Sequence, residues 1–364
     1  MGIYITSGVS LLPDGLNMDN LINGTIKPAR LSGHTPHLPN IIGERFIEEG
    51  AFVMPPTDKM IRRAAHAQSQ WVLYTGIKTW ENSNGEAFSP EQRGLFIGMG
   101  TSDADNNAYL IAADTTDDES YVSKALVETP PLMGLVLLNT STASQLSQHL
   151  NICGDNVFFS PHVDAGGQAL LEGYYSLKEN RSQFALCGGN GQKISPWYYL
   201  AYERLIKDMA WFPAEAASFI TLHGDNQQAD HEIVHVYRMT SQNSHQYARF
   251  LSEVNAWNLP PDQIIHVGKT EDPFTTQAYD TFPEALQFNL DKAVGYTGAA
   301  APFIAVNLAL AMAKKGVAVD NVNLNLIRQQ LPRLTLVLAH GLENQCIAVL
   351  LRMGLTKREK CDEA

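Results

Sequence analysis

The amino-acid sequence predicts an α/β fold with buried, largely parallel central sheets. Short apolar runs, such as Arg93–Gly100 and Gln183–Gly189, are typical of buried strands. Segments with apolar residues at helical spacing alternate with these runs along the whole chain, which favours strand–helix–strand units. The composition agrees and excludes a disordered chain, because 45% of the 364 residues are hydrophobic and only 18% are charged.

The first part of the chain is expected to open with a strand over Ile3–Thr6 that enters a glycine-containing turn. Residues 17–60 are rich in Pro, Gly and Asn, so we expect irregular structure there. A helix is predicted from about Asp58, because apolar residues recur at helical spacing. The polar, acidic segment 101–131 is expected to lie on the surface, and the helical pattern resumes over Leu138–Leu150.

The second part of the chain continues the alternation. The segment FFSPHVDAGGQALLEGYYSL, residues 158–177, predicts a strand, a sharp turn and a helix. Further expected elements are helices at 196–210, 243–256 and from about 298, and strands at 216–222, 231–238, 263–267, 333–338 and 346–351. No linker rich in Pro, Ser or Gly divides the chain, so we expect one fused body.

Charge and cysteine content exclude several classes of protein. The chain has 38 acidic and 26 basic side chains, a net charge of −12, so nucleic acid is not an expected partner. The four cysteines show no paired spacing, which argues against a disulfide framework and a zinc ribbon; they are Cys153, Cys187, Cys346 and Cys361. Free thiols fit a reducing cytosol, and we expect a cytoplasmic protein.

No membrane segment is expected. The opening MGIYITSGVSLLPDG lacks the basic and apolar regions of a signal peptide. The most apolar stretch, residues 299–313, is too short to span a bilayer comfortably and contains Pro302 and Asn307. A buried helix is the preferred interpretation of this stretch.

The run His231-Glu232-Ile233-Val234-His235 matches the HExxH pattern of zinc peptidases. That chemistry requires both imidazoles on one face of a helix, and Glu253 could serve as a third ligand. The flanking sequence is dense in β-branched residues and predicts a strand, on which the two histidines would stand about 13 Å apart. We therefore expect neither a metal nor a cofactor.

Two glycine-containing segments have more than one interpretation. Gly188-Gly189-Asn190-Gly191 follows a buried strand, as a phosphate loop would, but no Gly-Lys-Ser/Thr follows, so a tight turn is favoured. Asp164 stands at the turn entering a helix, with Ala165, Gly166 and Gly167 behind it, which is the shape of a nucleophile elbow. An N-capping aspartate with glycines for close packing explains the same segment.

Four segments in order resemble the β-ketoacyl synthase family of the thiolase-like fold. They are IYITSGVSLLPDG, NICGDNVFFSPHVDAGGQALLEGYYSL…FALCGG, KAVGYTGAAAPFIAVNLALA and LTLVLAHGLENQCIAVLLR. WFPAEAASFITL resembles a further strand entry of the family, so the resemblance spans nearly the whole chain. It implies a layered α-β-α-β-α fold of two pseudo-related halves, residues 1–215 and 216–364, within one structural unit.

The positions that match the family's catalytic residues depart from its pattern. The nucleophilic cysteine is matched by Asp164, which cannot form an acyl thioester. The second catalytic histidine is matched by Tyr296, and the first by His266, after which only Gly268 and Thr270 loosely follow the pattern.

Two further segments of the family's pattern are altered. Lys292 lies one residue off the family's lysine spacing. The glycine-rich loop reads His340-Gly341-Leu342-Glu343-Asn344, so Gly341 and Glu343 stand in a loop with bulky replacements. The resemblance therefore implies a degenerate centre, and no catalytic residue is expected.

One subgroup of the family, the chain length factors, keeps the fold and loses the cysteine, commonly with Gln-Ala-Gly-Gly at the elbow. Asp164-Ala165-Gly166-Gly167 looks like that pattern. The resemblance implies a non-catalytic subunit that pairs with an active β-ketoacyl-carrier-protein synthase, near the strand Gln183–Gly189, and shapes chain length in polyketide or aryl polyene synthesis.

The expected partners follow from that assignment. The acyl carrier protein is acidic and would dock mainly on the active subunit, because the net charge of −12 on this chain disfavours an acidic partner. The same acidity is also explained by solubility alone. One alternative is a divergent acyltransferase or decarboxylase in which Asp164, His266 and Tyr296 cooperate. Another is a stand-alone homodimer that binds acyl chains.

Overall fold

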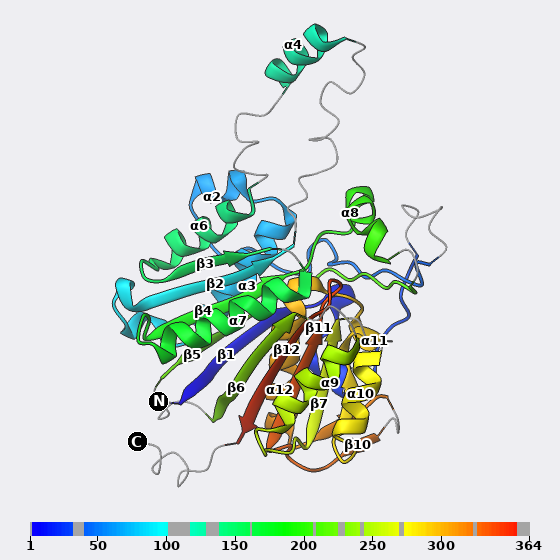
Figure 1. The fold of residues 1–364 in the computed structure, drawn as a ribbon. Coiled ribbons are helices and arrows are strands. Elements are labelled where there is room, and N and C mark those ends of the chain that lie inside the picture. The colour runs from blue at the N-terminus through cyan, green and yellow to red at the C-terminus, as the bar shows by residue number, and fades with distance from the viewer. Residues whose placement is uncertain are drawn as a thin grey trace.

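The structure is a computed structural model, and its main element is one large mixed sheet. It describes residues 2–31, 40–100, 117–128, 138–160, 162–206, 209–224, 230–240, 244–268, 273–322 and 326–354. The sheet has ten strands in the order β3-β2-β4-β5-β1-β6-β12-β11-β7-β8, and a separate hairpin pairs β9 (Ala318–Asp320) with β10 (Leu326–Arg328). Figure 1 shows this strongly twisted sheet with helices packed against it.

The large sheet is built from two halves with the same topology. The first half contains β1 (Ile3–Leu11), β2 (Arg93–Met99), β3 (Asn156–Phe159), β4 (Phe184–Asn190) and β5 (Ala217–His223). The second half contains β6 (His231–Thr240), β7 (Gln263–Gly268), β8 (Leu286–Asn289), β11 (Leu334–His340) and β12 (Gln345–Met353). The order β3-β2-β4-β5-β1 is matched by β8-β7-β11-β12-β6, with the same strand directions.

The halves meet where β1 and β6 pair antiparallel over Ile3–Ile5 and His231–Ile233. The expectation of two pseudo-related halves in a layered α/β fold is thus confirmed. β5, which follows the expected boundary at residue 215, pairs within the first half. The expectation of a largely parallel sheet is wrong for its middle, where the strands from β4 to β11 are antiparallel. Buried apolar runs look alike whichever way a neighbouring strand runs, so the pattern did not reveal direction.

Helices pack in three layers around the two half-sheets, except α4, which has no buried residue and lies away from the sheet in Figure 1. In the first part of the chain they are α1 (Met18–Asn23), α2 (Lys59–Ala64), α3 (Ala67–Glu81), α4 (Asp118–Glu128), α6 (Asn139–Leu150), α7 (His162–Lys178) and α8 (Pro196–Ile206). In the second part they are α9 (Ser244–Asn255), α10 (Pro273–Thr281), α11 (Leu290–Val294) and α12 (Ala301–Lys315). α7 and α12 pack against each other and against strands of both halves. Their shared core, with β2, β4, β7 and β11, is the largest hydrophobic cluster.

The outer layers follow from the alternation of side chains along each strand. On β2, Phe96 faces the middle core, whereas Leu95 and Ile97 face α3 and α6. On β7, Ile265 and Val267 face the middle core, and the opposite face packs under α9 and α10. The buried strands therefore separate three apolar cores, as the α-β-α-β-α arrangement requires.

Glycines allow the middle helices to approach the first half-sheet closely. A Cβ atom on Gly98 would collide with the backbone of Ala165, and one on Gly166 or Gly189 would collide with the Ala299 carbonyl oxygen. The glycines behind Asp164 thus serve close packing, one of the two interpretations left open. The expectation of a tight turn at Gly188 and Gly189 is wrong, because both lie inside β4.

Most expected elements are found at or near their expected bounds, and HEIVHVYR forms a strand, β6, as predicted. The irregular segment 17–60 contains one unexpected helix, α1, which begins with a capping box between Asn17 and Asn20. α4 lies within the segment 101–131, of which residues 101–116 and 129–131 lie outside the described part. β8, β9, β10, α10 and α11 were missed; all except α10 are between three and five residues long.

The apolar stretch at 299–313 begins in a short 3-10 turn and continues into α12, in which every residue from Ala301 to Ala309 is buried. This agrees with the expected buried helix. In the part of the chain that the structure describes, no helix is both long and apolar enough to cross a bilayer.

The strand expected at the partner surface lies elsewhere. β4 pairs with β2 on one side and with β5 on the other, so the segment Gln183–Gly189 has no free edge to offer. The expectation that a partner pairs there is wrong. Within the described residues, the edge strand of the first half is β3, which pairs only with β2.

Candidate functional site

The sharp turn before α7 places His162, rather than Asp164, at its tip. His162 is the first residue of α7 and has a φ of 69°, in the left-handed region that non-glycine residues rarely adopt. Such a conformation costs about 1 kcal/mol or more and is concentrated at functional sites. Asp164 lies two residues further on, inside the first turn of the helix.

Asp164 is held by an ion pair that links α7 to β6. Arg238 donates from Nε to Oδ1 at 2.8 Å and from Nη2 to Oδ2 at 2.9 Å. Gln168 donates a third hydrogen bond to Oδ2 at 2.6 Å, and Asp164 is only 8% exposed. Both carboxylate oxygens are therefore engaged, and the residue connects the two halves of the fold.

The His162 imidazole is half-buried and oriented by α8. Its Nδ1 lies 3.1 Å from the Tyr202 hydroxyl, and the two rings meet edge to face at 5.0 Å. Burial lowers the pKa of His162, while the charges of Glu343 and Asp164 act in the opposite direction. The imidazole is therefore neutral under ordinary conditions, with one ring nitrogen bonded to Tyr202.

Tyr296 brings a buried hydroxyl to the same turn. The residue is 5% exposed, and its hydroxyl has no hydrogen-bond partner within the described residues. Burial, reinforced by Tyr202 and Asp291, raises its pKa well above the usual value, and the Val163 backbone amide opposes this. The phenol therefore stays protonated and lies near the first turn of α7 as an unused donor.

The loop between β11 and β12 completes this cluster. Gly341 closes it by donating from its backbone N–H to the Gln345 carbonyl at 2.8 Å, and Asn344 takes a φ of 64°. The charge of Glu343 acts on both His162 and Tyr296. The structure thus brings Glu343, Tyr296 and Asp164 into one region, together with His162, which sequence reasoning missed.

Aromatic side chains from α8, together with Trp211, pack beside this region. The Tyr198 and Tyr202 rings stack at 4.4 Å, and Trp211 donates from Nε1 to the Tyr198 hydroxyl at 3.2 Å. Trp211 in turn lies 4.5 Å from the ring of Tyr296. The three tyrosines of PWYYLAYER were a usable signal, because residues 198 and 202 share one face of a helix.

His266 is not brought into this cluster. Alternation along β7 turns it away from the middle core, toward α10, where its ring meets Tyr279 at 5.2 Å. Nε2 lies 2.6 Å from Gln287 Oε1, and Nδ1 has no partner within the described residues. Burial lowers the pKa of His266 to about 4.

Other residues singled out from the sequence also have their own surroundings. His340 packs its ring against Tyr247 and Phe274 at 4.9 Å, on the outer side of the second half. Lys292 lies on α11, where its Nζ is 3.4 Å from the Asn321 carbonyl oxygen. Thr270 lies outside the described residues.

The side chains of the HEIVH run are engaged separately along β6. Glu232 forms an ion pair with Arg352, and the ring of His235 stacks on Trp257 at 4.9 Å. His231 Nδ1 lies 3.4 Å from the backbone N–H of Gly354. Across the described ranges of the chain, no group of three or more His, Cys, Asp or Glu side chains is placed to hold a metal ion.

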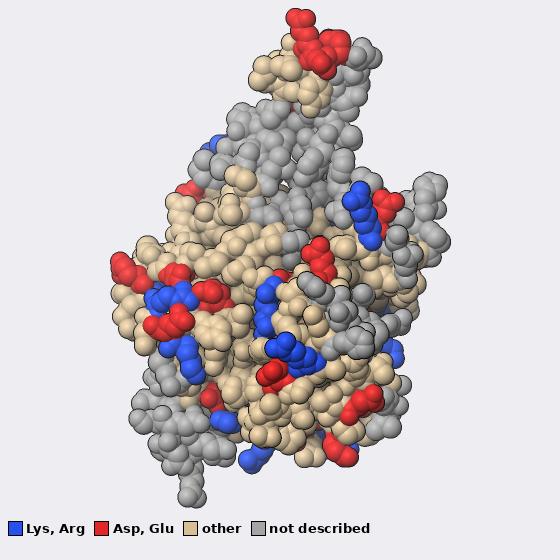
Figure 2. All heavy atoms as spheres, viewed as in Figure 1, with Lys and Arg blue, Asp and Glu red and all other residues tan. Residues whose placement is uncertain are grey.

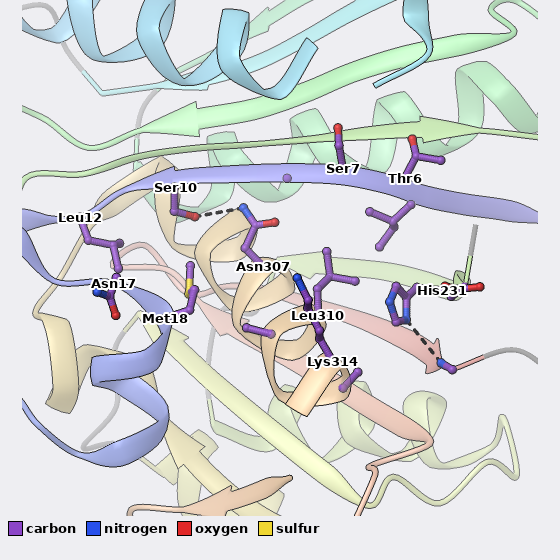
Figure 3. Close-up of a pocket in the computed structure, with 16 residues that line it drawn as sticks. Thr6, Ser7, Ser10, Leu12, Asn17, Met18, His231, Asn307, Leu310 and Lys314 are labelled. Carbon is purple, nitrogen blue, oxygen red and sulfur yellow. Dashed lines mark hydrogen bonds between the residues drawn. The ribbon is translucent and has the colours of Figure 1, made fainter. Parts of the chain in front are cut away.

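A separate groove of about 860 Å³ opens between β1 and α12 (Figure 3). Ser7, Ser10, Asn307 and Lys314 are among the residues that line it, and Asn307 Nδ2 donates to Ser10 Oγ at 3.0 Å. The groove follows the later turns of α12, whereas the elbow faces the loop before that helix. None of the residues singled out as a degenerate catalytic position lines it.

The acidic side chains do not form one continuous patch on the face shown in Figure 2, where basic and acidic side chains are interspersed. Arg181, just beyond α7, forms ion pairs with Asp155, Glu172 and Glu179. Such exposed pairs contribute little stability individually, so their main effect is to balance charge locally.

No family model matches the chain, and no curated protein is similar to it in sequence. Solved structures are similar in fold. A β-ketoacyl synthase from Burkholderia phymatum STM815 matches with a TM-score of 0.76 and 13% identity, over 97% of this chain and 100% of that one. A chain from a type II polyketide synthase complex, an acyl carrier protein with its ketosynthase bound to the hexaketide, matches with a TM-score of 0.73 and 13% identity, over 97% and 99%. The chain therefore has the thiolase-like fold of the β-ketoacyl synthases.

Proposed function

We propose that this chain is a ketosynthase-like subunit that does not condense acyl groups itself and pairs with an active β-ketoacyl-carrier-protein synthase. Its role is that of a chain length factor: it stabilises the active subunit and limits the length of the product in a polyketide or aryl polyene pathway. The acyl carrier protein docks mainly on the active subunit.

The observation that carries the proposal is the composition of the elbow. Condensation by the usual route needs a thiolate at this turn, where an acyl group is held as a thioester. The turn presents His162, and the carboxylate of Asp164 is engaged by Arg238. Of the cysteines in the described ranges, Cys187 and Cys346 are buried in β4 and β12, and Cys153 precedes β3.

The surroundings of the elbow support a structural role. The glycines of α7 and β4 are packed against the Ala299 carbonyl, and Asp164 joins the first half to the second. The acyltransferase or decarboxylase reading, with Asp164, His266 and Tyr296 acting together, has little support, because His266 faces α10 on the far side of β7.

The experiment is a reconstitution of chain elongation. The chain alone, an active ketosynthase from the same organism alone, and the two together are each given an acyl carrier protein charged with starter and extender units. We expect no elongated product from the chain alone, and more product of a narrower length from the mixture than from the ketosynthase alone. Elongation by the chain alone, or an unchanged product distribution in the mixture, contradicts the proposal.

A further inference from the structure

We infer that His162, at the tip of the elbow, is a general base for hydrolysis of an acyl thioester, with the Tyr296 hydroxyl as the donor to the carbonyl oxygen. This goes beyond the proposed function, from which it takes only the class of substrate. Condensation needs a thiolate, whereas hydrolysis needs a base, a water molecule and a donor for the developing oxyanion.

The first observation is the conformation of His162. Its φ of 69° lies at the start of a helix of 17 residues, where the backbone amides favour a developing negative charge. Histidine is among the non-glycine residues that tolerate this region, yet the conformation still costs energy. The backbone conformation alone does not require an imidazole there, since glycine or asparagine would adopt it with less strain or none.

The second observation is the orientation of the ring. Nδ1 faces the Tyr202 hydroxyl at 3.1 Å, and Tyr202 is buried between Tyr198 and Tyr296. When Nδ1–H donates to that hydroxyl oxygen, Nε2 carries the lone pair and can accept a proton. Tyr202 is therefore a positioning residue that fixes the plane of the ring, and the tautomer with Nδ1–H leaves Nε2 free to act as the base.

The third observation is independent of His162. The Tyr296 hydroxyl is buried and lacks a hydrogen-bond partner within the described residues, and it lies near the Val163 amide at the same turn. An unpaired buried hydroxyl costs about 1–3 kcal/mol. A carbonyl oxygen at this turn would accept a hydrogen bond from it.

The step balances without a further reactant. Nε2 of His162 takes a proton from water as the water oxygen bonds to the thioester carbon, and the carbonyl electron pair moves to the oxygen. The oxyanion accepts a hydrogen bond from Tyr296. The C–S bond then breaks, the sulfur takes the proton back from Nε2, and the products are a carboxylic acid and a thiol.

The test uses the full chain and the S-butanoyl thioester of N-acetylcysteamine, with release of thiol as the signal. His162→Asn keeps a residue that tolerates the left-handed backbone and removes the base. We expect it to lower kcat/KM about 100-fold, within the range for loss of a general base. Tyr296→Phe is expected to lower kcat about 10-fold with little change in KM, because the donor acts mainly in the transition state.

His149→Asn on α6 is the matched control and is expected to hydrolyse the probe at the wild-type rate. Thermal unfolding of each variant shows whether it has folded. A His162→Asn variant that folds and keeps wild-type hydrolysis, or a wild-type chain with no hydrolysis above buffer, overturns the inference. Complex formation with the ketosynthase is measured on the same wild-type sample: absence of a complex contradicts the proposed function, and a wild-type complex without hydrolysis overturns this inference alone.

Discussion

The buried imidazole of His266 makes the stability of this protein depend on pH. Burial lowers its pKa from 6.5 to about 4, so the folded state binds a proton less readily than the unfolded state. The contribution of His266 is complete above pH 6.5 and is lost as the pH falls toward 4, where the total loss is on the order of 3 kcal/mol.

His266→Gln, which keeps an amide near Gln287, is therefore expected to reduce the loss of stability between pH 6.5 and 4 by about that amount. The measurement is urea unfolding at a series of pH values, with His149→Gln on the partly exposed face of α6 as the control. Equal pH dependence in the wild type and His266→Gln would show that the imidazole is not neutral in the folded state.

The identity of the elbow residue illustrates what the sequence could reveal at this scale. The run SPHVDAGG predicted a sharp turn into a helix, which is correct, but the family spacing pointed to Asp164 at its tip. The tip is decided by which residue takes a positive φ, and His162 and Asp164 both tolerate it. The engagement of Asp164 with Arg238 joins residues 74 positions apart, which no local pattern encodes.

At the scale of elements, α7 is fixed by contacts that leave no room for a methyl group. A Cβ on Gly166 would meet the Ala299 backbone carbonyl, which cannot move without the loop that carries Tyr296. Gly166→Ala is expected to destabilise the protein by about 3 kcal/mol, at the upper end for overpacking, because the obstacle is backbone.

Gly341→Ala is the matched control, because a Cβ there would meet the end of the flexible Gln345 side chain. Chemical denaturation of both variants gives the comparison. A Gly166→Ala variant as stable as Gly341→Ala would show that α7 and the loop before α12 are less closely packed than described here.

Elements with strong patterns were predictable, and short ones were not. β2, β4, β7 and β11 are apolar runs buried on both faces, so their sequences specify strands without tertiary information. β8 spans only four residues, and α11 begins at the next residue, Leu290. Neither element is long enough for the strand or helix periodicity of apolar residues to be recognised. Their positions depend on the parallel pairing of β8 with β7.

At the scale of the whole molecule, the same topology occurs twice, and among the described residues β3 at one edge of the sheet pairs on one side only. Leu95 N–H bonds to the Asp155 carbonyl, so the register with β2 directs the N–H and C=O groups of Asn156 and Phe158 toward the free side of β3. An edge of this kind is a template for a strand of another chain. If the proposed pairing with a ketosynthase is correct, we expect the partner to add a strand at β3.

Asn156→Pro removes one of these outward N–H groups and leaves the pairing with β2 intact, whereas Asn156→Ser keeps the N–H. We expect the proline variant to fold and to bind the ketosynthase at least 10-fold more weakly, because one hydrogen bond is lost and the ring obstructs the incoming strand. The serine variant is expected to bind as the wild type does. Titration calorimetry with purified ketosynthase provides the measurement.

The central claim is that the chain is a partner subunit, and the most direct test is the mass of the complex in solution. The chain is co-expressed with an active ketosynthase from the same organism, purified through a tag on the ketosynthase, and examined by size-exclusion chromatography with light scattering. The account predicts one 40.1 kDa copy of this chain for each ketosynthase. Recovery of this chain only as a homodimer, with the ketosynthase eluting separately, would contradict it.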